Sequence, residues 1–79
     1  MEYIATFFTH FGAMSFHKKL KKLGHLSQMS PVPRELSSSC GTCVRFSCPF
    51  DPESMTIQDM EKVFISDGGV YKEIFSSEK

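Results

Sequence analysis

This 79-residue sequence lacks the features that mark several large classes of protein. Its most apolar stretch, residues 2–8 (EYIATFF), is far shorter than the roughly 20 residues of a bilayer-spanning helix. No basic segment precedes that stretch, as it would in a secretory signal peptide. Nine basic and nine acidic residues leave no net charge, which argues against nucleic acid as a partner. The sequence, which also has no internal repeat, therefore predicts one domain over residues 1–79 without membrane association.

Cysteine is also scarce, with three residues in the chain. An odd number of cysteines disfavours a disulfide-stapled secreted fold and favours a reducing cytoplasm. A zinc or iron–sulfur site needs four convergent ligands, but no second cysteine pair exists. In addition, Cys43 and Cys48 would point to opposite faces of a regular strand. We therefore expect a cytoplasmic protein without a metal ion or another cofactor.

The first half of the chain predicts a strand, a helix and a second strand. Residues 2–8 are apolar on both alternating faces, as in a central strand that is covered on both sides. Thr9 can cap a helix that runs to about Leu23, and Gly24 can end it. One side of this helix carries an apolar stripe and the other carries lysines: Ala13, Phe16, Leu20 and Leu23 against Lys18, Lys19, Lys21 and Lys22. Residues 25–30 predict a more polar strand at a sheet edge, which the following prolines end.

The second half predicts a strand, a helix and a final strand. Residues 42–50 alternate between apolar and polar side chains, which is typical of a strand with one buried face. Thr56 and Asp59 resemble the capping box of a second helix, which would end at residues 67–69. Residues 70–75 predict the last strand. The order β-α-β-β-α-β indicates an α+β fold, namely a ferredoxin-like two-layer sandwich with a four-stranded antiparallel sheet and two helices on one face.

The segment VPRELSSSCGTCVRF, residues 32–46, contains the most unusual pattern of the chain. Cys40 and Cys43 have the Cys-x-x-Cys spacing of dithiol oxidoreductases, but that chemistry works where the motif opens a helix. Here the motif opens a predicted strand, in which three residues span about 10 Å, beyond the roughly 7 Å Cα limit of a disulfide. A disulfide would need a turn, which Gly41 permits but does not require.

A single reactive cysteine is the other interpretation of this segment. Cys40 falls in the loop before the strand, where a partner protein can reach its thiol. The backbone N–H of Gly41 is open to an anion, and Arg34 and Arg45 can lie near enough to stabilise a thiolate. An inert loop thiol is the alternative. Cys48 is interpreted as a small buried hydrophobic residue, and the sequence leaves the role of Cys43 open.

The same segment resembles the characteristic motif of the selenium/sulfur (Se/S) carrier-like proteins, a family of small bacterial proteins. The matching positions are Pro31, Pro33, Arg34, Ser37, Ser38, Cys40, Gly41, Arg45 and Phe46. The resemblance extends over nearly the whole chain and implies that Cys40 accepts sulfur or selenium as a persulfide or selenopersulfide and passes it on. The sequence departs from the family pattern at Cys43 and Cys48. A second thiol near Cys40 can resolve a persulfide and release hydrosulfide, which favours a reductase-like or redox-sensing role.

The leading hypothesis is therefore a carrier or sulfurtransferase-like protein rather than a conventional enzyme, with a protein donor and a protein acceptor. A non-catalytic interaction module is the first alternative, in which an open sheet face with Cys43, Arg45 and Ser47 pairs with another subunit, for example in a homodimer. A dithiol redox protein that uses Cys40 and Cys43 is the second. The lysine side of the first helix is interpreted as a solvated face, with docking of an acidic partner as the alternative.

Overall fold

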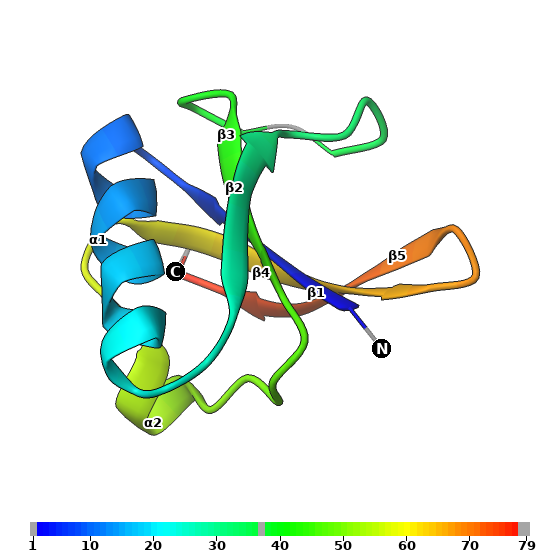
Figure 1. Ribbon diagram of the computed structural model, residues 1–79. Coiled ribbons are helices and arrows are strands. Elements are labelled where there is room, and N and C mark those ends of the chain that lie inside the picture. The colour runs from blue at the N-terminus through cyan, green and yellow to red at the C-terminus, as the bar shows by residue number, and fades with distance from the viewer. Residues whose placement is uncertain (1, 37, 78–79) are drawn as a thin grey trace.

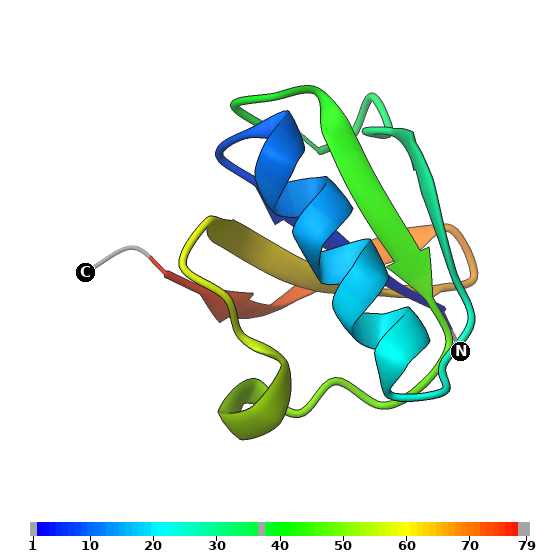
Figure 2. The same cartoon turned by 60° about the vertical axis from the view of Figure 1, so that its left-hand side comes forward.

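The computed structural model describes residues 2–36 and 38–77, which form a five-stranded antiparallel sheet and two helices (Figures 1 and 2). The elements are β1 (Glu2–Phe7), α1 (His10–Lys22), β2 (Ser27–Pro31), β3 (Thr42–Phe46), α2 (Pro52–Met55), β4 (Met60–Asp67) and β5 (Val70–Ser76). Neither helix in this part of the chain is long and apolar enough to cross a membrane.

The first strand, β1, lies at the centre of the sheet, whose order is β2-β3-β1-β4-β5. Ala5 pairs with Val44 of β3 on one side and with Val63 of β4 on the other. Ile4 and Ala5 point to opposite faces, and both are fully buried. The prediction of a central strand with two apolar faces is therefore confirmed, and the reason is that both faces of β1 exclude water.

The first helix begins as its capping residue predicts. Thr9 Oγ1 accepts a hydrogen bond from the backbone N–H of Gly12 at 3.0 Å, which satisfies one of the free donors of the first turn. Gly24 follows the helix end with φ +84°, the left-handed conformation that glycine adopts without strain. Leu23 was predicted to lie in the apolar stripe, but it is the residue at which α1 ends and it is half exposed.

A single hydrophobic core lies between the helices and one face of the sheet (Figure 2). The ring of Phe16 from α1 lies 5.4 Å from the ring of Phe7 and 5.5 Å from that of Phe46, so aromatic pairs join the helix to β1 and β3. Met55 of α2 belongs to the same cluster. Its buried members are Ala5, Phe7, Ala13, Phe16, Leu20, Val44, Phe46, Met55, Met60 and Val63.

The prediction of a second helix from Thr56 onward is wrong, because β4 occupies most of that segment. Val63, Phe64 and Ile65 are β-branched and aromatic residues, which favour a strand. Gly68 and Gly69 have φ values of +59° and +86°, so they form a two-residue hairpin turn between β4 and β5 instead of ending a helix. The short helix α2 lies earlier, between the strand predicted over residues 42–50 and the helix predicted from Thr56.

The α+β class and the antiparallel sheet are confirmed, whereas the count of four strands is wrong. The ferredoxin-like arrangement is not confirmed, since α2 is a single turn and the unpredicted strand β4 replaces the second helix. The strand predicted over residues 70–75 is confirmed as β5. The strand predicted over residues 42–50 ends at Phe46, so Cys48 lies beyond it.

Candidate functional site

The loop between β2 and β3 holds Cys40 at the edge of the core. The N–H of Val32 donates to the carbonyl oxygen of Gly41 at 3.1 Å and closes the loop at its base. Gly41 has φ +74°, a conformation that favours glycine at this position. The Ser38 hydroxyl donates to the carbonyl oxygen of Phe7 at 3.0 Å, which ties the loop to the end of β1. Ser37, one of the motif positions, lies outside the described residues.

The Cys40 thiol is free and half-buried, and it packs against the hydrophobic core. Its Sγ lies 3.4 Å from the carbonyl oxygen of Thr42, to which it donates, and 3.9 Å from Ser38 Oγ. The Ser38 hydroxyl donates its proton to the carbonyl oxygen of Phe7 and therefore does not donate to the sulfur. The loop thus holds a half-buried thiol to which neither of these polar neighbours donates.

The start of α1 lies directly beside this loop. His10 Nδ1 is 3.3 Å from Thr42 Oγ1, two residues after Cys40. In Figure 2 the loop lies above the first turn of α1. Phe8 and Phe11, next to this junction, expose 41% and 73% of their surface. A molecule that approaches the Cys40 thiol from this side therefore meets aromatic surface.

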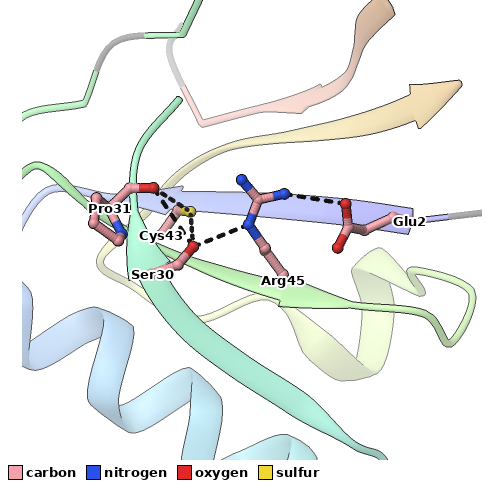
Figure 3. A network of polar contacts seen from close by, with 5 residues as sticks. All are labelled: Glu2, Ser30, Pro31, Cys43 and Arg45. Atoms are coloured by element: carbon pink, nitrogen blue, oxygen red, sulfur yellow. Dashed lines mark hydrogen bonds and ion pairs between the residues drawn. The ribbon is translucent and has the colours of Figure 1, made fainter. Parts of the chain in front are cut away.

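The two arginines proposed to flank Cys40 make their contacts elsewhere. Arg34 is exposed and forms no hydrogen bond or ion pair with another described residue. Arg45 donates from Nε to Ser30 Oγ at 3.0 Å and forms an ion pair with Glu2 at 3.0 Å (Figure 3). Within the described part of the chain, neither guanidinium bonds to the Cys40 thiol.

Arg45 instead belongs to a polar network around Cys43, on the sheet face opposite the helices (Figure 3). Cys43 is fully buried, and its Sγ lies 3.3 Å from Ser30 Oγ and 3.7 Å from the carbonyl oxygen of Pro31. The Ser30 hydroxyl accepts from Arg45, and both this hydroxyl and the Cys43 thiol donate to the carbonyl oxygen of Pro31, at 3.5 and 3.7 Å. Arg45, Ser30 and Cys43 therefore form one connected network, and no buried nitrogen or oxygen of the described side chains lacks a partner.

The third thiol, Cys48, follows β3 and is half-buried against the core. Burial raises the pKa of the Cys48 thiol, and a hydrogen bond to its own backbone opposes that shift. These observations agree with its interpretation as a small hydrophobic residue.

His10 and His17 contact hydroxyl groups rather than one another. His17 Nδ1 lies 2.6 Å from Ser27 Oγ, and His10 contacts Thr42. The described residues contain no group of three or more histidine, cysteine or acidic side chains with the spacing of a metal site. Cys40 and Cys43 are both free, and their contacts lie on different sides of β3.

Comparison with known proteins agrees with the motif around Cys40. The model of the family described as "Putative Se/S carrier protein-like" matches residues 2–68. The chain is also similar to the uncharacterized protein YtiA of Escherichia coli (strain K12), with 26% identity over 73 residues, which cover 90% of this chain and 86% of that protein. No solved structure matches the chain significantly.

Proposed function

Because this chain belongs to the Se/S carrier protein-like family, we propose that Cys40 holds sulfur or selenium as a persulfide or selenopersulfide and transfers it between two cytoplasmic proteins. One observation carries the choice of residue. Of the three thiols, Cys40 lies in a loop that contacts solvent, whereas Cys43 is fully buried and burial raises the pKa of Cys48. A sulfur carrier needs an accessible thiol that can form a thiolate.

The transfer itself requires no metal and no net oxidation. The Cys40 thiolate attacks the terminal sulfur of a donor persulfide, the donor S–S bond breaks, and the electron pair leaves with the donor thiolate. The proton from Cys40 goes to solvent or to that leaving thiolate. An acceptor nucleophile then attacks the terminal sulfur on Cys40 and releases the Cys40 thiolate. The same sequence applies to a terminal selenium atom.

The surroundings of Cys40 suggest how the anionic sulfur would be held. Gly41 follows Cys40 directly in the sequence, so its backbone N–H is the adjacent main-chain donor along the chain, and the exposed Arg34 has no described partner that would keep it away. Arg45 is already held by Ser30 and Glu2, so its contribution requires that it leave this ion pair. We therefore assign Gly41 and Arg34 the larger part in stabilising the thiolate and Arg45 the smaller part.

Two other functions predict different behaviour of the same residues. In a dithiol redox protein, Cys43 would have to leave Ser30 and Pro31 and cross to the other side of β3 before it could meet Cys40. In an interaction module, Cys40 could be replaced without functional loss, and the sheet face with Arg45 and Cys43 would contact the partner.

The test is to incubate the reduced protein with a cysteine desulfurase and cysteine, and then to record intact and peptide mass spectra. We expect the mass of one added sulfur atom on the Cys40 peptide, absent in Cys40→Ser and retained in Cys43→Ser. A Cys40–Cys43 disulfide with released hydrosulfide would favour the redox protein. Absence of any adduct would exclude sulfur transfer from this donor and favour the interaction module.

A further inference from the structure

We propose that the outer face of α1 is the docking surface for the sulfur-donor protein, and that the donor places an apolar group beside Cys40 and carboxylates against the α1 lysines. We define the outer face as the exposed side of the helix with Phe11, Met14, Ser15, Lys18, Lys19, Lys21 and Lys22. The inference rests on the proposed function of Cys40, and it adds the surface and the chemistry by which the donor is recognised.

The exposed and the buried residues of α1 lie on opposite sides of the helix. At about 100° per residue, Phe11, Lys18 and Lys22 lie within a narrow sector opposite the buried Ala13 and Leu20. The N-terminal half of the outer face is apolar, because Phe11 is 73% and Met14 is 39% exposed. The C-terminal half is cationic. One face therefore offers two kinds of contact along a single helix.

The cationic half has no counter-charge within the described molecule. The helix contains no acidic residue, and the two described ion pairs, Arg45–Glu2 and Lys62–Glu73, lie on the sheet. A groove of about 690 Å³ runs along this face and is lined by Ser15 and the four lysines. Lysines in the last turn also stabilise the helix dipole. That effect accounts for some of the charge but not for the exposed aromatic and methionine side chains one or two turns earlier.

The apolar half is continuous with the Cys40 loop. Ser38 bonds to the carbonyl oxygen of Phe7, and Thr42 bonds to His10, so the residues on both sides of Cys40 are fixed to the segment that begins α1. A donor seated on Phe11 can therefore present its persulfide to the thiol. A rise of 1.5 Å per residue puts Lys18 and Lys22 roughly 10 and 16 Å from Phe11. The donor should carry its carboxylates at about this distance from the apolar group that contacts Phe11.

A protein fits this face better than nucleic acid does. The apolar half offers no contact to phosphate, and the chain as a whole has no net charge. Charge complementarity between lysines and carboxylates guides association and increases its rate, whereas a buried aromatic side chain supplies affinity. The two halves therefore suit a transient complex with an acidic protein.

The test compares two sulfur sources that differ only in their need to dock. A cysteine desulfurase with cysteine is the protein donor, and inorganic polysulfide is the small-molecule donor. We expect Lys18→Glu combined with Lys22→Glu to slow loading of Cys40 by the desulfurase about tenfold or more, and to leave loading by polysulfide unchanged. Phe11→Ser should have a similar effect. Added salt should slow the reaction of the parent protein but have little effect on the lysine variant.

Matched controls separate docking from a general effect of charge or hydrophobicity. Lys72 is exposed on β5, whose hairpin lies on the other side of the molecule from α1 in Figure 1, so Lys72→Glu should leave both rates unchanged. Val70 is 68% exposed at the same hairpin, and Val70→Ser is the control for Phe11→Ser. Equal rates for the parent and the lysine variant, or equal losses in variant and control, would overturn the docking surface.

A binding measurement distinguishes failure of this inference from failure of the carrier function. Cys40→Ser cannot be loaded, but its affinity for the desulfurase can be measured by fluorescence anisotropy. If neither source loads the parent protein, the carrier proposal fails. The docking surface would still be supported if the desulfurase binds and if Lys18→Glu combined with Lys22→Glu weakens that binding. Absence of binding would overturn it. Binding of RNA instead of the desulfurase would also overturn the proposed docking surface, in favour of RNA. Self-association that Lys18→Glu combined with Lys22→Glu removes would overturn it in favour of a second copy of the chain.

Discussion

Cys40 and Cys43 are three residues apart in the sequence, but they occupy opposite kinds of environment. Cys40 lies in a loop that contacts the core on the helix side of the sheet, with a half-exposed thiol. Cys43 lies inside β3 on the other face, where its thiol is fully buried and bonded to Ser30 and Pro31. The difference shows that the backbone, rather than the Cys-x-x-Cys spacing, decides what each thiol can do.

The two thiols also differ in where their polar contacts lie. Cys43 of β3 contacts Ser30 and Pro31 of β2, and Arg45 of β3 donates to the same Ser30, so these contacts join the two strands. Replacing Cys43 removes contacts between β3 and β2, which makes the network a structural element. The contacts of Cys40, at 3.4 and 3.9 Å, are with Thr42 and Ser38, each two residues away in the sequence. Its sulfur can therefore change partners without disturbing the sheet.

The largest expected difference between Cys40 and Cys43 is the rate at which each thiol reacts with an alkylating reagent. We expect N-ethylmaleimide to modify Cys40 at least roughly 100-fold faster than Cys43, because reaching Cys43 requires local opening that costs a few kcal/mol. Peptide mass spectrometry of samples quenched over time measures both rates in one experiment. Modification at equal rates, in protein whose circular dichroism shows it folded, would contradict the burial of Cys43.

Replacement of Cys43 should lower the stability of the fold more than replacement of Cys40. Cys43→Ala removes a fully buried thiol and its contacts with Ser30 and Pro31, so we expect a loss of about 1–2 kcal/mol in the free energy of unfolding. Cys40→Ala, the matched control, should cost about 0.5 kcal/mol because its thiol is only half-buried. Urea unfolding with equal m-values measures the difference. A larger loss for Cys40→Ala would show that the loop, not the network, stabilises this region.

The sequence predicted the first half of the fold better than the second. Thr9, Gly24 and the two apolar faces of β1 are local signals, and each has the predicted role in the structure. The helix predicted from Thr56 is wrong because the apolar residues of that segment match a helical period by coincidence. The pairing of β4 with β1 skips Glu61, and this irregularity lets Met60 and Val63, three residues apart, both join the core. The Asp-Gly-Gly sequence before β5 was the available signal for a hairpin.

For the candidate site, the sequence placed Cys40 in a loop but could not place its neighbours. The prediction that Arg34 and Arg45 flank the thiol depended on sequence distance, whereas contacts across the sheet decide the partners of Arg45. Strand alternation does separate Arg45 from Val44 and put it on the face of Cys43. Its ion pair with Glu2 depends on the pairing of β1 with β3, which follows from the tertiary fold alone.

Cys48 is a third case, because its thiol is half-buried against the core but has no described network like that of Cys43. Burial raises the pKa of its thiol above the ordinary value of 9.0, so the unfolded chain releases the proton first as the pH rises. The stability from the neutral thiol is therefore complete below pH 9.0 and is lost as the pH rises through the folded-state pKa. We expect the stability difference between the parent and Cys48→Ala to shrink above that pH in urea unfolding under reducing conditions. Cys43→Ser and Cys40→Ala, measured alongside, control for the other thiols. A difference that stays constant or grows with pH would show that burial does not govern this thiol.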